Sequence, residues 1–68
     1  MDPDANLKEQ LEIVRDIQKV YDDCNADGTF TEYQEVHLSE QAGRLAELVE
    51  AMDGWIVKGG FLPKRWRR

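Results

Sequence analysis

The chain has 68 residues, a single cysteine and a formal net charge of −5 at pH 7. This length allows one small domain covering residues 1–68, excludes an internal disulfide, and leaves a core that is marginal unless a metal or a second chain adds to it. The acidic start lacks the basic residues and apolar run of a secretory signal, and no apolar stretch is long enough to span a membrane. We therefore expect a soluble, cytoplasmic protein that does not bind membranes.

Charge is distributed unevenly along the chain. Residues 1–63 contain all 14 Asp and Glu residues but only five Lys and Arg, which leaves a formal charge of −9, whereas the last five residues, KRWRR, add +4. A body of that charge repels nucleic acid, so nucleic acid is not the expected partner. Any contact with DNA or RNA would have to run through the basic tail.

The first predicted helix spans about residues 3–22. Asp2 followed by Pro3 is typical of an N-cap with proline at the first helical position. Apolar residues then recur at the spacing of an amphipathic helix: Leu7, Leu11, Ile13, Val14, Ile17, Val20 and Tyr21. The helix is expected to end near Asp22 or Asp23, where a cluster of Asp, Asn and Gly begins.

The second predicted helix spans about residues 40–58. Its apolar residues again recur at spacings of three and four and form one broad face: Leu38, Ala42, Leu45, Leu48, Val49, Met52, Trp55 and Ile56. Ser39 is expected to cap this helix, and Glu40 and Arg44 to form an i,i+4 ion pair. Gly59 and Gly60 are expected to end it in a left-handed turn.

The segment between the two helices contains a helix-start motif, TEYQ. Thr31 and Gln34 match the capping box, in which each side chain accepts a hydrogen bond from the other residue's backbone N–H. We expect a short helical piece over about residues 32–37, separate from the second helix; the alternative is one continuous helix from Thr31 to Lys58. In both cases the pattern predicts an all-α antiparallel helical hairpin, followed by an extended tail over residues 59–68.

Residues 23–34, DCNADGTFTEYQ, resemble the calcium loop of an EF-hand. Asp23, Asn25 and Asp27 occupy the first, third and fifth ligand positions. The twelfth position, which normally holds a bidentate Glu, is Gln34, which offers one neutral carbonyl oxygen. We therefore interpret the segment as an ordinary turn and expect no cofactor. Weak calcium binding through these four side chains is the alternative.

Residue types that carry catalysis are sparse. Cys24 and His37 are 13 residues apart, with no companion at ligand spacing and no second histidine. The carboxylates of the first helix follow solvent-facing positions, and Gly59 and Gly60 follow a helix, whereas a phosphate-binding loop precedes one. We expect a protein that is not an enzyme.

The C-terminal segment GGFLPKRWRR places large apolar residues outside any long helix, next to a basic run. One interpretation is that Phe61 and Leu62 fold back over the end of the hairpin, with Trp66 along the first helix. The other is that Trp66 and its neighbouring arginines recognise an acidic protein surface or nucleic acid, because aromatic stacking and guanidinium contacts combine there. The candidate nucleic-acid residues are Lys64, Arg65, Arg67 and Arg68.

A start of Asp2-Pro3, the segment GRLAELVEAMDGWIVKGGFLP and a closing tryptophan among basic residues together resemble small proteins encoded by actinobacterial phages and their hosts. The matching positions, Asp2, Pro3 and residues 43–66, are 26 of the 68 residues of the chain. The resemblance implies the cytoplasm of a bacterial host cell as the setting. It implies no particular activity or binding residue.

Two helices alone cover each apolar stripe on one side only, and apolar burial stabilises fully only where water is excluded all round. We therefore expect a protein–protein interaction module, a small accessory or regulatory protein that docks on a partner protein or pairs with itself as a homodimer. The candidate partner-binding residues are Leu45, Leu48, Val49, Met52, Trp55, Ile56, Phe61 and Trp66.

Overall fold

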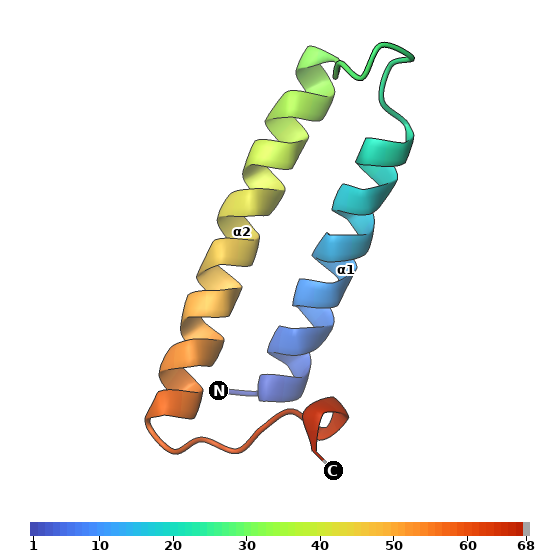
Figure 1. The fold of residues 1–68 in the computed structure, drawn as a ribbon. Coiled ribbons are helices and arrows are strands. Elements are labelled where there is room, and N and C mark those ends of the chain that lie inside the picture. Colours follow the sequence, from blue (N-terminus) through green and yellow to red (C-terminus); the bar gives the residue numbers. More distant parts are fainter. Residues whose placement is uncertain (68) are drawn as a thin grey trace.

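The computed structural model describes residues 1–67, which form two antiparallel helices and a short C-terminal turn (Figure 1). Helix α1 spans Pro3–Asp22, α2 spans Glu32–Val57, and the 3₁₀ turn η1 spans Lys64–Trp66. No strand occurs in this part of the chain. The predicted all-α helical hairpin is therefore confirmed. The N-terminus and the tail lie at the end of the hairpin opposite the α1–α2 loop.

Helix α1 begins and ends where the local sequence predicts. Asp2 Oδ1 accepts hydrogen bonds from the N–H groups of Asp4 at 3.0 Å and Ala5 at 3.2 Å, and Pro3 occupies the first helical position. These bonds satisfy donors that the first turn of a helix leaves without a partner. The helix ends at Asp22, with Asp23 as its C-cap, which agrees with the predicted end near Asp22 or Asp23.

Helix α2 shows that the prediction of two separate helical pieces was wrong. The capping box is present: Thr31 N–H donates to Gln34 Oε1 at 2.9 Å, and Gln34 N–H donates to Thr31 Oγ1 at 3.1 Å. From there the helix runs without a break to Val57, so residues 32–37 are its first turns. Ser39 lies inside the helix instead of capping a second one at residue 40. Extending a helix costs less than nucleating another, and no Gly or Pro interrupts the intervening residues.

A glycine pair turns the chain at the end of α2. Gly59 has a φ of 92°, its N–H donates to Ile56 O at 3.0 Å, and Gly60 N–H donates to Trp55 O at 2.9 Å. This is a Schellman motif, in which a left-handed residue lets the last carbonyls of the helix find donors. The predicted left-handed end is therefore confirmed.

The tail packs against the N-terminal end of α1. Pro63 is buried, and Lys64 N–H donates to the Asp4 carboxylate at 2.7 Å. The tail is not extended throughout as predicted, because residues 64–66 form η1, with Trp66 N–H donating to Pro63 O at 2.9 Å. The tail is therefore part of the folded unit.

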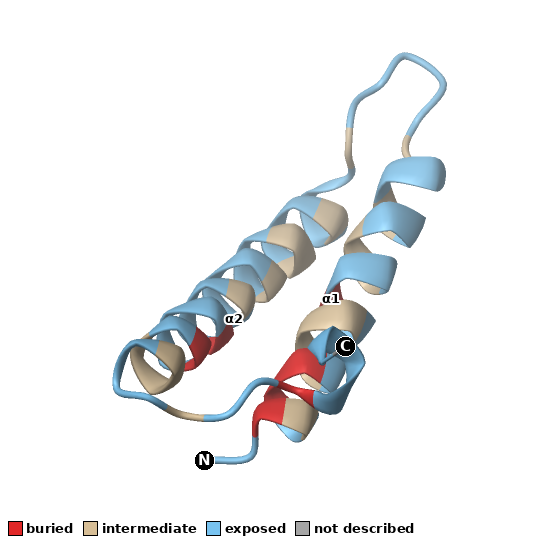
Figure 2. Ribbon diagram, turned by 60° about the horizontal axis from the view of Figure 1, so that its bottom comes forward, coloured by how far each residue is buried: buried red, intermediate tan, exposed pale blue. Residues whose placement is uncertain are grey.

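The core lies where α1 meets α2, mostly in the half of the hairpin nearer the tail (Figure 2). Its buried apolar side chains are Leu7, Ile13, Leu48 and Met52, joined by Pro3 and Pro63. The molecule measures 46 × 22 × 14 Å along its principal axes, so it is one layer of helices thick. Within residues 1–67, neither long helix combines the length and apolar character that crossing a membrane requires.

Candidate functional site

One edge of the hairpin is closed by polar side chains that join α1 to α2. Arg44 Nε and Nη2 donate to the two carboxylate oxygens of Glu9 at 2.6 and 2.9 Å, and Arg44 Nη1 donates to Glu47 at 3.3 Å. The hydrogen bond from Arg44 holds the pKa of Glu9 below its ordinary value. Arg44 therefore bridges the two helices, in place of the local pair predicted with Glu40.

A second polar cluster lies on the same edge, nearer the loop. Asp16 is seven residues after Glu9 and so shares its side of α1. The Asp16 carboxylate accepts a hydrogen bond from Gln41 Nε2 at 2.8 Å and lies 2.5 Å from His37 Nε2. These two hydrogen bonds, that of Gln41 foremost, hold the pKa of Asp16 below its ordinary value. His37 is thus a structural partner of Asp16.

A buried amide fixes how the helices meet. Asn6 is buried in the contact; its Nδ2 donates to Leu48 O at 3.0 Å, and its Oδ1 accepts from Gln10 Nε2 at 2.6 Å. Both ends of the amide have partners, so its burial leaves no polar group unsatisfied. A polar contact inside an apolar interface favours one register of α1 on α2 over others.

The opposite edge of the hairpin is apolar and open. Near the tail it contains a hollow of about 230 Å³, lined by Gln10, Val49, Met52, Asp53, Ile56 and Trp66. At about 100° per residue, four further side chains fall on the same side and continue the hollow toward the loop. We call the following set the apolar face: Val14 and Tyr21 from α1, Leu38, Leu45, Val49 and Ile56 from α2, and Trp66 from the tail.

Much of the apolar face is accessible to solvent. Val49 is 48% exposed, Trp66 45% and Tyr21 58%, and the other members are half-buried or at the border of exposure. Leu48 and Met52, in contrast, point into the hairpin and are only 6% and 4% exposed. The structure thus divides the predicted partner-binding residues between the core and the surface.

Two of the predicted partner-binding residues, Trp55 of α2 and Phe61 of the tail, contact each other and fix the tail on the end of α2. Trp55 Nε1 donates to Phe61 O at 2.9 Å, and the two rings meet edge to face with centroids 5.4 Å apart. The Trp55 ring also lies directly against Gly60. Phe61 is exposed on its other side, where the guanidinium of Arg67 lies 5.3 Å from its ring centroid.

The candidate nucleic-acid residues differ in how they are held. Lys64 and Arg65 are exposed. Arg67 is partly fixed, because its Nε donates to Leu62 O at 2.9 Å. Arg68 lies outside the described residues.

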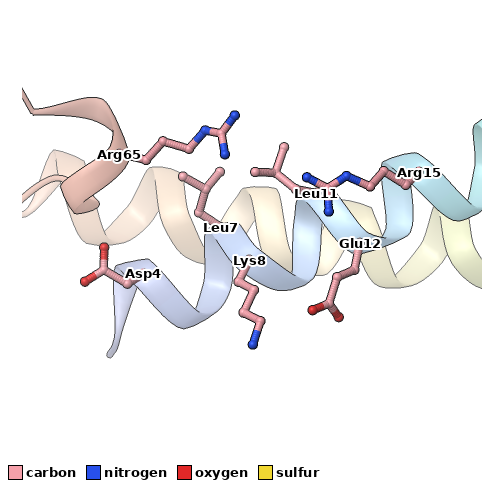
Figure 3. A pocket seen from close by; sticks show the side chains of 7 residues that line it. All are labelled: Asp4, Leu7, Lys8, Leu11, Glu12, Arg15 and Arg65. Carbon is pink, nitrogen blue, oxygen red and sulfur yellow. The ribbon is translucent and has the colours of Figure 1, made fainter.

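Figure 3 shows the surroundings of Arg65 beside the start of α1. Its side chain extends over Leu7 in the direction of Leu11, and Arg15 approaches Leu11 from the other end. The hollow between them has a volume of about 220 Å³ and is also lined by Asp4, Lys8 and Glu12. Acidic and basic groups are mixed here, so this surface is not uniformly basic.

Two of the four candidate calcium ligands, Asp27 and Gln34, use a side-chain oxygen for hydrogen bonds within the calcium-like loop. Asp27 Oδ1 accepts from Thr29 Oγ1 at 2.7 Å and from Thr29 N–H at 3.0 Å, and these bonds hold the pKa of Asp27 below its ordinary value. Asn25 Nδ2 donates to Thr29 Oγ1 at 3.0 Å. Gln34 Oε1 serves the capping box, and its Nε2 donates to Asp23 O at 3.3 Å. Such side-chain hydrogen bonds are typical of an ordinary turn, and weak calcium binding stays the alternative hypothesis.

Three members of the apolar face, Val14, Tyr21 and Leu38, are not among the residues predicted to bind a partner. A signal for them exists in the sequence, since Val14 and Tyr21, like Leu38 and Leu45, are seven residues apart and so share a side of their helix. The sequence does not show which side of each stripe meets the other helix. That choice separates core residues from surface residues.

The chain matches no family model, no curated protein and no solved structure. The apolar face and the basic tail are therefore the features from which a function is inferred.

Proposed function

We propose that this protein is a non-enzymatic protein–protein interaction module whose apolar face docks on another protein surface. The observation that carries this proposal is an accessible apolar face on a hairpin only 14 Å thick. Stable domains bury the apolar side of each helix against a second layer, and within residues 1–67 no second layer covers this side. The bacterial cytoplasm, implied by the resemblance of residues 43–66, is the proposed setting.

The total accessible surface supports the same proposal. The chain exposes 5196 Å², whereas a compact monomer of 7.9 kDa is expected to expose about 4,400 Å². The excess of about 800 Å² reflects the elongated, single-layer shape, and it is of the size that one partner contributes to a standard protein–protein interface. Exposed apolar patches with polar rims are typical of such interfaces.

A photo-crosslinking amino acid at position 49 tests the proposal, with position 36 as the matched control. Val36 is 52% exposed, close to the 48% of Val49, and it lies on the same helix about 140° away around the axis. On irradiation in a bacterial lysate, position 49 should give protein adducts and position 36 should not. The adducts should disappear when Ile56→Glu places a charge on the apolar face of a chain that circular dichroism shows to be folded.

An adduct from position 49 to a second copy of the chain and an adduct to a different protein both support docking through the apolar face. Equal adduct yields from positions 49 and 36 would mean that other proteins contact the apolar face no more than the opposite side of α2, which contradicts the proposal. No adduct from position 49 would contradict the proposal directly.

A further inference from the structure

We propose that the apolar face binds a second copy of this chain turned end for end, so that two hairpins form an antiparallel four-helix assembly. This inference rests on the proposed function and names the occupant of the same face. A hairpin one layer thick supplies half of a four-helix bundle. A two-fold axis through the apolar face lets each copy cover the other with the same patch.

The two ends of the hairpin carry opposite charge. Residues 22–35, at the loop end, contain five Asp and Glu and no Lys or Arg, whereas residues 58–68 contain five Lys and Arg and no Asp or Glu. The α1–α2 loop and the tail lie at opposite ends of the 46 Å long axis (Figure 1). Asp2 and Asp4 lie at the tail end too, but the five Lys and Arg of residues 58–68 outnumber them. Each copy therefore presents an acidic end and an end that is net basic.

This charge distribution selects one orientation of the second copy. When two hairpins pack end for end, the basic tail of each lies beside the acidic loop of the other, and opposite charges meet twice. When they pack in the same direction, loop meets loop and tail meets tail, and like charges repel at both ends. Charge complementarity of this kind sets orientation and excludes the wrong arrangement.

The apolar face is placed to allow full overlap. Its α2 members run from Leu38 to Ile56, and their midpoint lies close to the middle of α2, which spans Glu32–Val57. A two-fold axis between Leu45 and Val49 therefore lays face on face along its length. The same axis brings the tail of one copy alongside the start of α2 in the other.

Charged groups at both ends are available for such contacts. Asp22 and Glu35 at the loop end are exposed, as are Lys64 and Arg65 in the tail. None of these four takes part in an ion pair within residues 1–67. They can therefore pair between copies without breaking an ion pair inside one copy.

Sedimentation velocity of the purified chain over a concentration series measures this association. We expect a reversible dimer whose dissociation constant rises with salt, because exposed charges are screened. Replacing the tail pair with Lys64→Glu and Arg65→Glu should raise the dissociation constant roughly tenfold or more, since like charges then meet at both ends.

A second pair of substitutions, Asp22→Lys with Glu35→Lys, should restore the dimer when added to the tail-reversed chain. The matched control adds Glu40→Lys with Glu50→Lys instead, at exposed positions of α2 away from the apolar face. Both four-fold variants have the same net charge, so only the first should regain wild-type association. Circular dichroism and thermal melts confirm that each variant keeps its helices.

The outcomes separate the inference from the function on which it rests. A chain that stays monomeric at all concentrations overturns the second copy as occupant, while adducts from position 49 to another protein leave the proposed function intact. A dimer that ignores the tail reversal, or that the control pair restores equally well, overturns the end-for-end arrangement. If only Asp22→Lys with Glu35→Lys restores the dimer of the tail-reversed chain, the end-for-end arrangement is supported.

Discussion

Replacing Gly60 with alanine should release the tail from the end of α2. A Cβ at position 60 would lie 2.3 Å from Trp55 Cε2, a distance at which one of the two must move. The Trp55 ring cannot yield without losing its 2.9 Å hydrogen bond to Phe61 O and its edge-to-face contact with the Phe61 ring. The tail would then lose its anchor on α2.

The cost of Gly60→Ala follows from those two contacts. A hydrogen bond contributes about 0.5–1.5 kcal/mol net, and an aromatic pair contributes about the same, so the loss should be about 1–3 kcal/mol. For a chain of this size, each 1 kcal/mol lowers the melting temperature by about 4–8 °C. Thermal unfolding followed by far-UV circular dichroism measures the loss, and tryptophan emission should shift toward that of solvent-exposed indole.

A double-mutant cycle isolates the clash. In a Trp55→Ala background the space beside Gly60 is open, so adding Gly60→Ala should cost almost nothing. Gly59→Ala is the contrast, because nothing lies within 4 Å of a Cβ there and its cost comes from a φ of 92° instead, independently of Trp55. If Gly60→Ala were equally costly with and without the Trp55 ring, the proposed anchoring would be refuted.

Two further predictions concern the core and the polar edge. Met52→Ala, at a side chain 4% exposed, should destabilise the chain by about 2–5 kcal/mol in denaturant unfolding, whereas Leu62→Ala, at 40% exposure, should cost much less; equal costs would contradict the location of the core. Hydrogen bonds from Gln41 and the neighbouring imidazole of His37 lower the pKa of Asp16 in the folded chain. The stability that the ionised Asp16 carboxylate contributes is therefore present above the ordinary aspartate pKa of about 3.9, and it is lost as the pH falls through the lowered pKa. Asp16→Asn should therefore destabilise the chain near pH 7, and the difference from wild type should shrink steadily below pH 4; a difference that stays constant down to pH 2 would show that the carboxylate charge is not involved.

Signals that act within one turn of a helix could be found in the sequence. Asp2 and Pro3 start α1 and Gly59 ends α2, as predicted. The predicted Thr31–Gln34 capping box is present, but it starts α2 itself and not a separate short piece. The predicted break between residues 37 and 40 was wrong. A serine that could cap a helix at position 39 does not by itself end a helix that is already formed over residues 32–37. Continuation of a helix is decided by neighbouring turns, and these favour one helix.

The sequence by itself determined that this chain forms two amphipathic helices, and it determined all of their ends except the start of α2, because caps, glycines and apolar spacing act over three to seven residues. Only the tertiary structure decided how each stripe divides, with Met52 enclosed and Val49 left in solvent. It also decided that Arg44 pairs with Glu9, 35 residues away, instead of with its neighbour Glu40. Such choices depend on how the two helices are rotated about their axes, and that rotation is set by long-range contacts such as Asn6 with Leu48 O, which no local pattern encodes.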